Sequence, residues 1–311
     1  MKLKVILISG LVVALTIWIG IEISDRITSD KQSFLTSEPV QTQTEGNEIS
    51  FNPPSLDDVP DGPLGEAIKD GYNLVNETHV YADDYVGNQL SCTSCHAGAG
   101  LEELGSPFVG VTTQYPQYRP REGIVFTLED RINGCMIRSM NGKPFPNDSP
   151  EMRSMIAYFT YISEGIPVGA ELPWREQNNM KEIPIPNLAD GEELYQQSCV
   201  ACHAVDGSGI GANTGPALWG ENSFNDGAGM TRLSKMAAFI QQNMPPGGEG
   251  TFTDQEAVNI AAYILQHDRP EFADKDKDFP HGGKPSDFID KERREQIKNG
   301  TIDWKEVVGQ E

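Results

Sequence analysis

Apolar residues recur at helical spacing in several stretches of this chain. Between residues 63 and 78, Leu64, Ile68, Tyr72 and Val75 follow one another at intervals of three and four, which places them on one face of a helix. The same spacing predicts helices at residues 127–140, 149–162, 190–197 and 253–264. We therefore expect an all-α fold.

Three of these stretches begin with residues that cap helices. Thr127 stands three residues before Asp130, and Thr253 stands three residues before Glu256, which is the spacing of a capping box. Ser149 precedes Pro150, and proline is favoured at the first helical position because its missing N–H has no partner there. These signals fix where the helices begin.

The N-terminus carries an apolar run of a different kind. Residues 5–23 are mostly apolar and follow Lys2 and Lys4, and about 20 apolar residues suffice to cross a bilayer. We expect an uncleaved anchor that leaves the rest of the chain on the periplasmic or extracytoplasmic side, because the lysines stay inside. The alternative is a signal peptide that is removed. Residues 29–60, rich in Ser, Thr, Gln, Glu and Pro, are expected to form a flexible linker.

Two cysteine motifs carry the chemistry. Cys92-Thr93-Ser94-Cys95-His96 and Cys199-Val200-Ala201-Cys202-His203 both have the pattern C-x-x-C-H, the attachment site of a c-type haem. The two thiols bond to the haem vinyl groups, and the histidine becomes the proximal ligand of the iron. We expect two covalently bound haems, held by Cys92, Cys95 and His96 and by Cys199, Cys202 and His203.

Each motif lies between two predicted helices, so the chain contains a weak internal duplication. We expect two class I-like cytochrome c domains in tandem, each with one haem. The predicted organisation is a signal anchor at 1–28, a linker at 29–60, cytochrome c domain 1 at 61–172, a linker at 173–186, cytochrome c domain 2 at 187–272 and a C-terminal tail at 273–311.

Charge narrows the choice of partner. The formal net charge of −22 excludes a general affinity for nucleic acid. An acidic surface suits docking to a basic electron-transfer partner, although it also serves solubility alone. The charge makes an anionic substrate difficult to bind unless positive charge is concentrated locally.

The second iron needs a ligand on its distal side. Met244 lies in a proline-rich loop ahead of the last predicted helix of domain 2, where small cytochromes c usually supply a thioether. Met236 and Lys235 are alternatives, and Met236 also fits a helical core pattern with Ala237 and Ile240. We favour Met244.

The first iron has an unusual candidate at the matching place. Cys135 lies 39 residues after His96, while Met244 lies 41 residues after His203. Cys135 is the one cysteine outside the haem motifs, and iron binding would explain it. A thiolate ligand lowers the haem potential, so the two haems would differ. Met136 and Met140 are the alternatives, with Cys135 then an inert buried thiol.

Positive charge gathers around Cys135 within 25 residues of an otherwise acidic chain, at Arg119, Arg121, Arg131, Arg138 and Lys143. Arginine binds oxoanions through paired donors in a fixed fork. The cluster therefore indicates a pocket for a small dianion such as a sulfur oxoanion. The thiolate would lie where that substrate arrives, so Cys135 is also a candidate to carry a covalent sulfur adduct.

These motifs resemble the dihaem thiosulfate dehydrogenases (TsdA-type). The resemblance covers roughly residues 71–268 and is carried by Leu90–His96, Tyr115–Arg119, Arg121-Glu122, Arg131–Cys135, Arg138–Lys143, Ser149–Met152 and Asn243–Pro245. Some members have a lysine just before the distal methionine. That position is Asn243 here, so a lysine-for-methionine ligand exchange at it is not expected.

The resemblance implies an enzyme that couples two thiosulfates into tetrathionate, with the reverse reaction also open to it. It implies that the haem held by His96 and Cys135 is the active site, with Arg121, Arg131 and Ser139 on the substrate side. The haem held by His203 would exchange electrons with an external partner, such as a cytochrome c or a membrane redox complex.

Three other functions compete with this one. A dihaem electron carrier explains the haems and the anchor but gives Cys135 and the arginines no purpose. A cytochrome subunit of another sulfur-oxidation system would act with a carrier protein instead of free thiosulfate. A dihaem peroxidase would need an open iron near a calcium site, and the sequence shows no such pattern.

Overall fold

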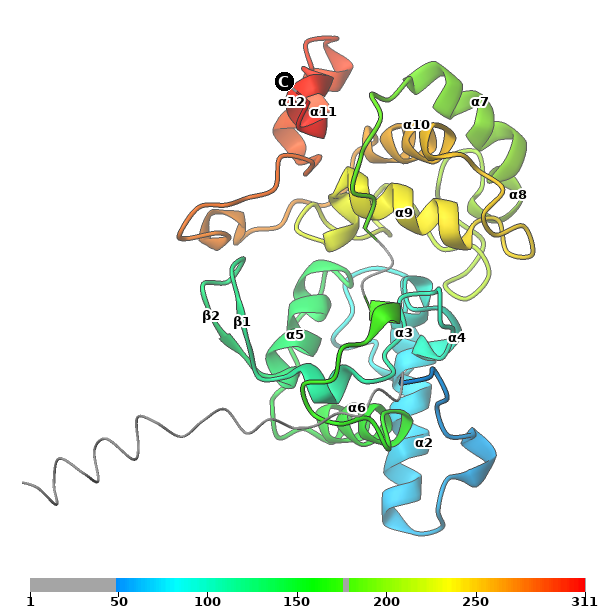
Figure 1. Ribbon diagram of the computed structural model, residues 1–311, viewed down its shortest axis with the longest axis vertical. Coiled ribbons are helices and arrows are strands. Elements are labelled where there is room, and N and C mark those ends of the chain that lie inside the picture. Colours follow the sequence, from blue (N-terminus) through cyan, green and yellow to red (C-terminus); the bar gives the residue numbers. More distant parts are fainter. Residues whose placement is uncertain (1–48, 176–178, 311) are drawn as a thin grey trace, which may run out of the picture. The chain divides into compact units, whose positions relative to one another are not determined.

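The computed structural model describes residues 49–175 and 179–310. Figure 1 shows its helices and strands, coloured along the sequence from blue to red. Cytochrome c domain 1 contains α2 (Pro63–Asn76), α3 (Thr78–Tyr81), α4 (Ala97–Gly100), α5 (Leu128–Arg138) and α6 (Pro150–Ile162). Domain 2 contains α7 (Leu188–Ser198), α8 (Val200–His203), α9 (Leu233–Asn243) and α10 (Asp254–Leu265), and α11 (Lys291–Lys298) and α12 (Trp304–Val308) follow it. Short 3-10 helices lie at Leu56–Asp58, Cys92–Ser94, Val111–Gln114, Pro173–Arg175, Gly229–Thr231 and Lys275–Lys277.

The predicted helix starts are confirmed. Thr127 and Asp130 form a capping box at α5, and Thr253 and Glu256 form one at α10. The Ser149 side chain accepts a hydrogen bond from the backbone N–H of Met152 at the start of α6. These caps satisfy helical N–H groups that lack a partner within the helix.

The two domains use the same helix crossing. In domain 1, α2 packs against α6, and in domain 2, α7 packs against α10 (Figure 1). A Cβ on Gly71 of α2 would lie 2.0 Å from the carbonyl oxygen of Ser154, and one on Gly191 of α7 would lie 2.1 Å from that of Asn259. Both crossings therefore need a glycine, and this repeated geometry supports the internal duplication.

Helices dominate the described residues, in agreement with the all-α expectation, and one short hairpin that was not predicted is added to them. Strands β1 (Gln117–Arg119) and β2 (Ile124–Phe126) form an antiparallel hairpin in which Tyr118 pairs with Val125. Ile, Val and Phe favour extended backbone, which explains the second strand, but three residues are too few for a recognisable alternation. The hairpin leads directly into α5.

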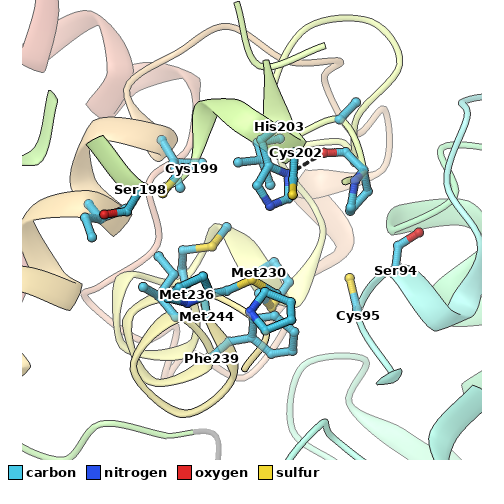
Figure 2. Close-up of a pocket in the computed structure, with 18 of the residues that line it drawn as sticks. Ser94, Cys95, Ser198, Cys199, Cys202, His203, Met230, Met236, Phe239 and Met244 are labelled. Atoms are coloured by element: carbon cyan, nitrogen blue, oxygen red, sulfur yellow. Dashed lines mark hydrogen bonds between the residues drawn. The ribbon is translucent and has the colours of Figure 1, made fainter. Parts of the chain in front are cut away.

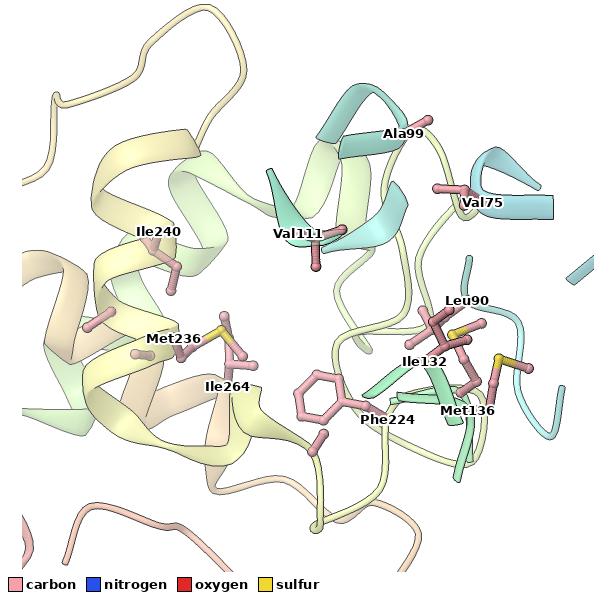
Figure 3. Packing of buried hydrophobic residues seen from close by; sticks show 14 of the residues in the cluster. Val75, Leu90, Ala99, Val111, Ile132, Met136, Phe224, Met236, Ile240 and Ile264 are labelled. Atoms are coloured by element: carbon pink, nitrogen blue, oxygen red, sulfur yellow. The ribbon is translucent and has the colours of Figure 1, made fainter. Parts of the chain in front are cut away.

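The domains share one apolar core. Phe224, from the loop that precedes α9, lies with Met236 and Ile264 on one side and Leu90, Ile132 and Met136 on the other (Figure 3). Backbone contacts add to this packing, since the N–H of Gln89 donates to the carbonyl of Asn222 at 3.3 Å. The loop at residues 222–225 thus links domain 2 to the first haem motif.

The C-terminal segment packs onto domain 2. Ile297 of α11 and Val307 of α12 are buried, and the Arg294 guanidinium lies 3.5 Å from a carboxylate oxygen of Asp226, with both side chains buried.

Trp174, inside the range predicted as a linker, is also buried and donates to the Val109 carbonyl at 3.0 Å.

No helix within residues 49–175 and 179–310 is both long enough and apolar enough to cross a membrane. The predicted anchor at 1–28 lies outside the described residues, as does most of the predicted linker at 29–60.

We predict that Gly71→Ala and Gly191→Ala each lower the free energy of unfolding of the haem-loaded protein by about 1–3 kcal/mol, because a new methyl group meets a backbone carbonyl that cannot move aside. Urea denaturation measures the change. The matched control is Gly229→Ala, whose Cβ would meet nothing within 4 Å. Equal stability of the Gly71 and Gly229 variants would contradict the crossing geometry.

Candidate active site

In the first haem motif, the surroundings of His96 leave its Nε2 atom available to bind a metal. The backbone oxygen of Ser106 lies 2.5 Å from His96 Nδ1, and the imidazole stacks on Phe108 with ring centroids 4.1 Å apart. Burial lowers the pKa of His96 to about 4, so the ring is neutral near pH 7. With Nδ1 donating to the backbone, Nε2 keeps its lone pair for iron.

The first cavity, of about 750 Å³, opens beside His96. Leu90, Phe108, Val111, Leu128, Ile132, Met155 and Phe159 provide much of its apolar lining. Cys92 and Cys95 line it, and burial raises the pKa of both thiols to about 12. The lining suits a large flat apolar group with two thiols at its edge.

Helix α5 brings the predicted catalytic residues to this cavity. Arg131, Cys135 and Ser139 recur every four residues from α5 to its C-cap, so they share one side of the helix, and all three line the first cavity. Arg131 Nη1 lies 2.7 Å from Cys135 Sγ, and the pKa of Arg131 is raised chiefly by the charge of Cys135. The guanidinium therefore places a positive charge next to the Cys135 sulfur. Met136 and Met140 also line the first cavity, so they remain alternative ligands.

The second cavity, of about 880 Å³, lies beside the second motif and is lined by Cys199, Cys202 and His203. The Pro216 carbonyl lies 2.8 Å from His203 Nδ1, which repeats the arrangement at His96. Figure 2 shows the His203 imidazole on one side of the cavity and three methionine side chains, Met230, Met236 and Met244, on the other.

The two cavities share a wall. Leu90 and Cys95 line both, and Figure 2 shows Cys95 of the first haem motif beside the second cavity. Ser94 Oγ donates to the Ala212 carbonyl at 3.0 Å, which holds the first motif against domain 2. A group bonded to Cys95 in the first cavity therefore lies next to the second.

Both cavities fit a c-type haem. Each has two cysteines and a histidine whose Nδ1 is occupied by a backbone carbonyl, and each has a mainly apolar lining. Each also has sulfur ligand candidates, a thiol and two thioethers in the first and three thioethers in the second. These are the donors that hold haem iron in proteins.

Arg121 lies elsewhere. Of the predicted substrate-side residues, Arg131 and Ser139 line the first cavity, whereas Arg121 binds Asp278 of the C-terminal segment, with Nη2 2.7 Å from a carboxylate oxygen. Arg138 binds the same carboxylate. The positive cluster is thus divided between the cavity and a neighbouring ion pair.

Comparisons with known proteins agree with this geometry. Residues 78–168 match the family described as SoxA/TsdA, cytochrome c domain, and residues 186–264 match the family described as Cytochrome C oxidase, cbb3-type, subunit III. A thiosulfate dehydrogenase of Psychrobacter arcticus is 38% identical over 250 residues, which cover 79% of this chain and 76% of the relative. One of Allochromatium vinosum is 40% identical over 232 residues, covering 72% of this chain and 86% of the relative.

The chain belongs to the thiosulfate dehydrogenase family. The solved structure of a thiosulfate dehydrogenase (TsdBA) from Marichromatium purpuratum has a TM-score of 0.66 and 33% identity, covering 70% of this chain and 49% of that chain. This chain therefore spans about half the length of that protein. The predictions of cytochrome c domains and covalently bound haem are confirmed at the level of the family.

Two residues that line the cavities of this thiosulfate dehydrogenase family member were not predicted from the sequence. Arg175 lines the first cavity and donates to the Pro107 carbonyl at 3.1 Å, although it lies in the range predicted as a linker. Met230 lines the second cavity without a recognisable motif around it. Only the Trp174-Arg175 pair offered a signal, because a tryptophan is unexpected in a flexible linker.

We predict that Met244→Leu lowers the reduction potential of the second haem by on the order of 0.1 V, because a thioether ligand raises that potential and leucine cannot supply one. Spectroelectrochemical titration of the holoprotein measures it. Met230→Leu and Met236→Leu are the matched controls, since both residues line the same cavity. A comparable drop in the Met236 variant with none in the Met244 variant would assign the ligand to Met236.

Proposed function

We propose that this protein is a dihaem cytochrome c that oxidises thiosulfate to tetrathionate and passes two electrons to an external acceptor. The same site would reduce tetrathionate when electrons are supplied. The observation that carries the proposal is the alignment of Arg131, Cys135 and Ser139 on one side of α5, facing a cavity that also contains a haem attachment motif. The relatives named thiosulfate dehydrogenase support it over 72–79% of this chain.

The residues have separable roles in this proposal. Cys92, Cys95, His96 and Cys135 would hold the first haem, and Cys199, Cys202, His203 and Met244 the second, so that each iron would have one histidine and one sulfur ligand. When bound, the haems supply two one-electron acceptors, which matches a two-electron coupling.

The reaction joins two S₂O₃²⁻ into S₄O₆²⁻ and releases two electrons. Two dianions repel each other strongly in a cavity from which water is excluded, so fixed positive charge must offset that repulsion. Arg131 and Arg175 supply such charge at the first cavity. Ser139, with a hydroxyl donor at the same cavity, would hydrogen bond to a sulfonate oxygen and orient the outer sulfur toward the Cys135 side.

Arg121 is not assigned to the substrate in the first cavity. Its fork is occupied by Asp278 and by the Gly227 carbonyl, to which Nη2 donates at 2.7 Å. We therefore assign Arg131, Cys135 and Ser139 to the substrate in the first cavity, and Arg121 to the charge cluster beside it.

The proposed cellular location and electron partner rest on the haem attachment chemistry, the N-terminal sequence and the net charge. Covalent haem attachment through two thiols takes place outside the cytoplasm, and the apolar run at residues 5–23 would hold the protein to the membrane there. The acidic chain suits a cytochrome c or membrane redox complex with a basic docking face. A pure electron carrier explains neither the Arg131–Cys135 contact nor the length of the family match.

We predict that thiosulfate reduces the haems of the oxidised wild-type protein and that Cys135→Ala abolishes this reduction, because the thiolate and its charge are lost from the first cavity. The absorption spectrum before and after thiosulfate addition measures it. Met136→Leu and Met140→Leu are the controls, since both side chains line the same cavity. Full activity in the fully haem-loaded Cys135 variant would remove Cys135 from the mechanism.

We predict that Arg131→Gln lowers kcat/KM for thiosulfate by about a hundredfold, the usual cost of removing one group that stabilises charge in a closed site. Arg131→Lys should lose less, because it keeps the charge without the fork. Steady-state kinetics with an artificial electron acceptor measure both. The control is Arg153→Gln, on the exposed surface of α6. Equal effects of the Arg131 and Arg153 variants would contradict the role of Arg131.

A further inference from the structure

Asp278 forms an unusually complete ion pair with two arginines that are far away in the sequence. Its Oδ2 accepts from Arg121 Nε at 2.9 Å, from Arg121 Nη2 at 2.7 Å and from Arg138 Nη1 at 3.0 Å, and its Oδ1 accepts from Arg138 Nη2 at 2.7 Å. The three side chains are only 11–15% exposed. One carboxylate thus fills a place built from two guanidinium forks, the arrangement by which proteins hold oxoanions.

The arginine pair is not fully satisfied by this carboxylate. Arg138 Nε is buried without a hydrogen-bond partner. Glu122, the nearest other carboxylate, approaches Arg138 Nη2 only to 3.8 Å. Burial lowers the pKa of Arg121, and its hydrogen bonds to Asp278 act against that shift, so an anion at this place is favoured.

The site adjoins the first cavity. Arg138 is the last residue of α5, and Ser139, its neighbour in sequence, lines that cavity with Arg131 and Cys135. Arg138 also lies over the Phe272 ring, 4.2 Å from its centroid, which fixes the guanidinium plane. The arginine pair is therefore a second concentration of positive charge at the end of the catalytic helix.

The segment that carries Asp278 is attached to the C-terminal part of the chain near its two ends, where Lys275 pairs with Glu292 at 3.1 Å and Lys284 pairs with Asp290 at 2.8 Å. At one end, the Phe272 N–H donates to Asp226 Oδ1 at 2.7 Å, and at the other the Ser234 N–H donates to Asp287 Oδ2 at 3.0 Å. We call residues 273–286 the strap. Most of its residues are exposed, and Gly282 and Gly283 both have φ of +79° with nothing within 4 Å of an added Cβ. The strap has an unpacked turn beside Asp278.

Between its ends, the strap contacts the β1–β2 hairpin and the end of α5 through Asp278, Phe279 and Pro280. Asp278 binds the arginines, the Phe279 N–H donates to the Arg121 carbonyl at 2.6 Å, and Pro280 fills the space over Gly123. Release of Asp278 would remove the ion pair from these contacts and weaken the hold on the centre of the strap, while the Lys275 and Lys284 pairs near its ends stay in place.

We propose that Asp278 is an internal competitor for a second oxoanion site, formed by Arg121 and Arg138, and that a dianionic sulfur oxoanion displaces it. This inference rests on the proposed function, which requires two dianions near one another. It makes Asp278 a specificity-determining residue. Two arginines carry two positive charges, which a dianion neutralises fully and a single carboxylate only half.

Charge then decides which anions enter. Asp278 is tethered, so its effective concentration at the arginines is high, and a free monoanion that offers the same charge cannot displace it. A dianion gains the additional attraction of the second charge in a site of reduced dielectric constant. The strap thus favours thiosulfate and tetrathionate over chloride or bicarbonate.

We predict that sulfate speeds hydrogen–deuterium exchange of the Phe279 amide and of its neighbours in the strap of the wild-type holoprotein. Perchlorate, which has the same tetrahedral shape and one charge, should leave exchange unchanged at equal ionic strength. Mass spectrometry of peptides spanning residues 275–284 measures the exchange, with α11 as the internal control. No effect of sulfate would overturn the proposal, and an equal effect of perchlorate would overturn its charge selectivity.

The matched variant is Asp278→Asn, with Asp274→Asn as control because the exposed Asp274 carboxylate pairs with the exposed Lys277 at 2.8 Å. In the Asp278 variant, strap exchange should be fast without sulfate, and KM for thiosulfate should fall about fivefold, a typical coupling between competing ligands. A higher KM in a folded Asp278→Asn protein would show that Asp278 braces the arginines instead.

These outcomes separate this inference from the proposed function. If sulfate frees the strap but thiosulfate never reduces the haems, the arginine site stands and the proposed reaction fails. If thiosulfate is oxidised normally but sulfate leaves the strap unchanged, only the role of Asp278 fails.

Discussion

The docking of the C-terminal end of helix α5 onto domain 2 is the contact on which the active site depends. The last carbonyls of a helix lack partners within it, and here three in succession are satisfied from outside. Asn225 donates to Ile137 through Nδ2 at 2.9 Å and to Arg138 through its backbone N–H at 3.3 Å, while Asn88 Nδ2 donates to the Ser139 carbonyl at 2.8 Å. The helix that carries Cys135 is therefore positioned by residues of both domains.

Asn88 also ties the second cavity to the first. Its Nδ2 donates to the Ser223 carbonyl at 3.1 Å, and its Oδ1 accepts from the N–H of Leu90, a residue that lines both cavities. One half-buried amide thus holds the end of α5, the loop of domain 2 and the wall between the cavities together. Because sliding would break several of these hydrogen bonds at once, the contacts resist movement of one domain over the other.

The sequence was informative where the determining interactions are local. The haem motifs, the capping residues of α5, α6 and α10, and the four-residue spacing of Arg131, Cys135 and Ser139 all depend on neighbours along the chain. The position of Asp278 could not be foreseen, because it lies 140 residues from Arg138 and a polar tail offers many carboxylates. Arg175 and Met230 reach the cavities through tertiary packing alone, and the β1–β2 hairpin is too short to show a period.

The ligand candidates of the two cavities give electron flow a direction. A thiolate donates electron density and lowers the potential of the iron it binds, whereas a thioether opposite histidine raises it. Cys135 at the first cavity and Met244 at the second would therefore make the second haem the better acceptor. Electrons released by thiosulfate oxidation beside Cys135 would then pass to domain 2 across the wall formed by Leu90 and Cys95. The pairing of Arg131 with Cys135 tunes this difference further, since a guanidinium 2.7 Å from the sulfur withdraws part of the density that the thiolate would give to iron. In the proposed reaction the same arginine would moderate the ligand and attract the substrate, and its place one helical turn from the cysteine suits both roles.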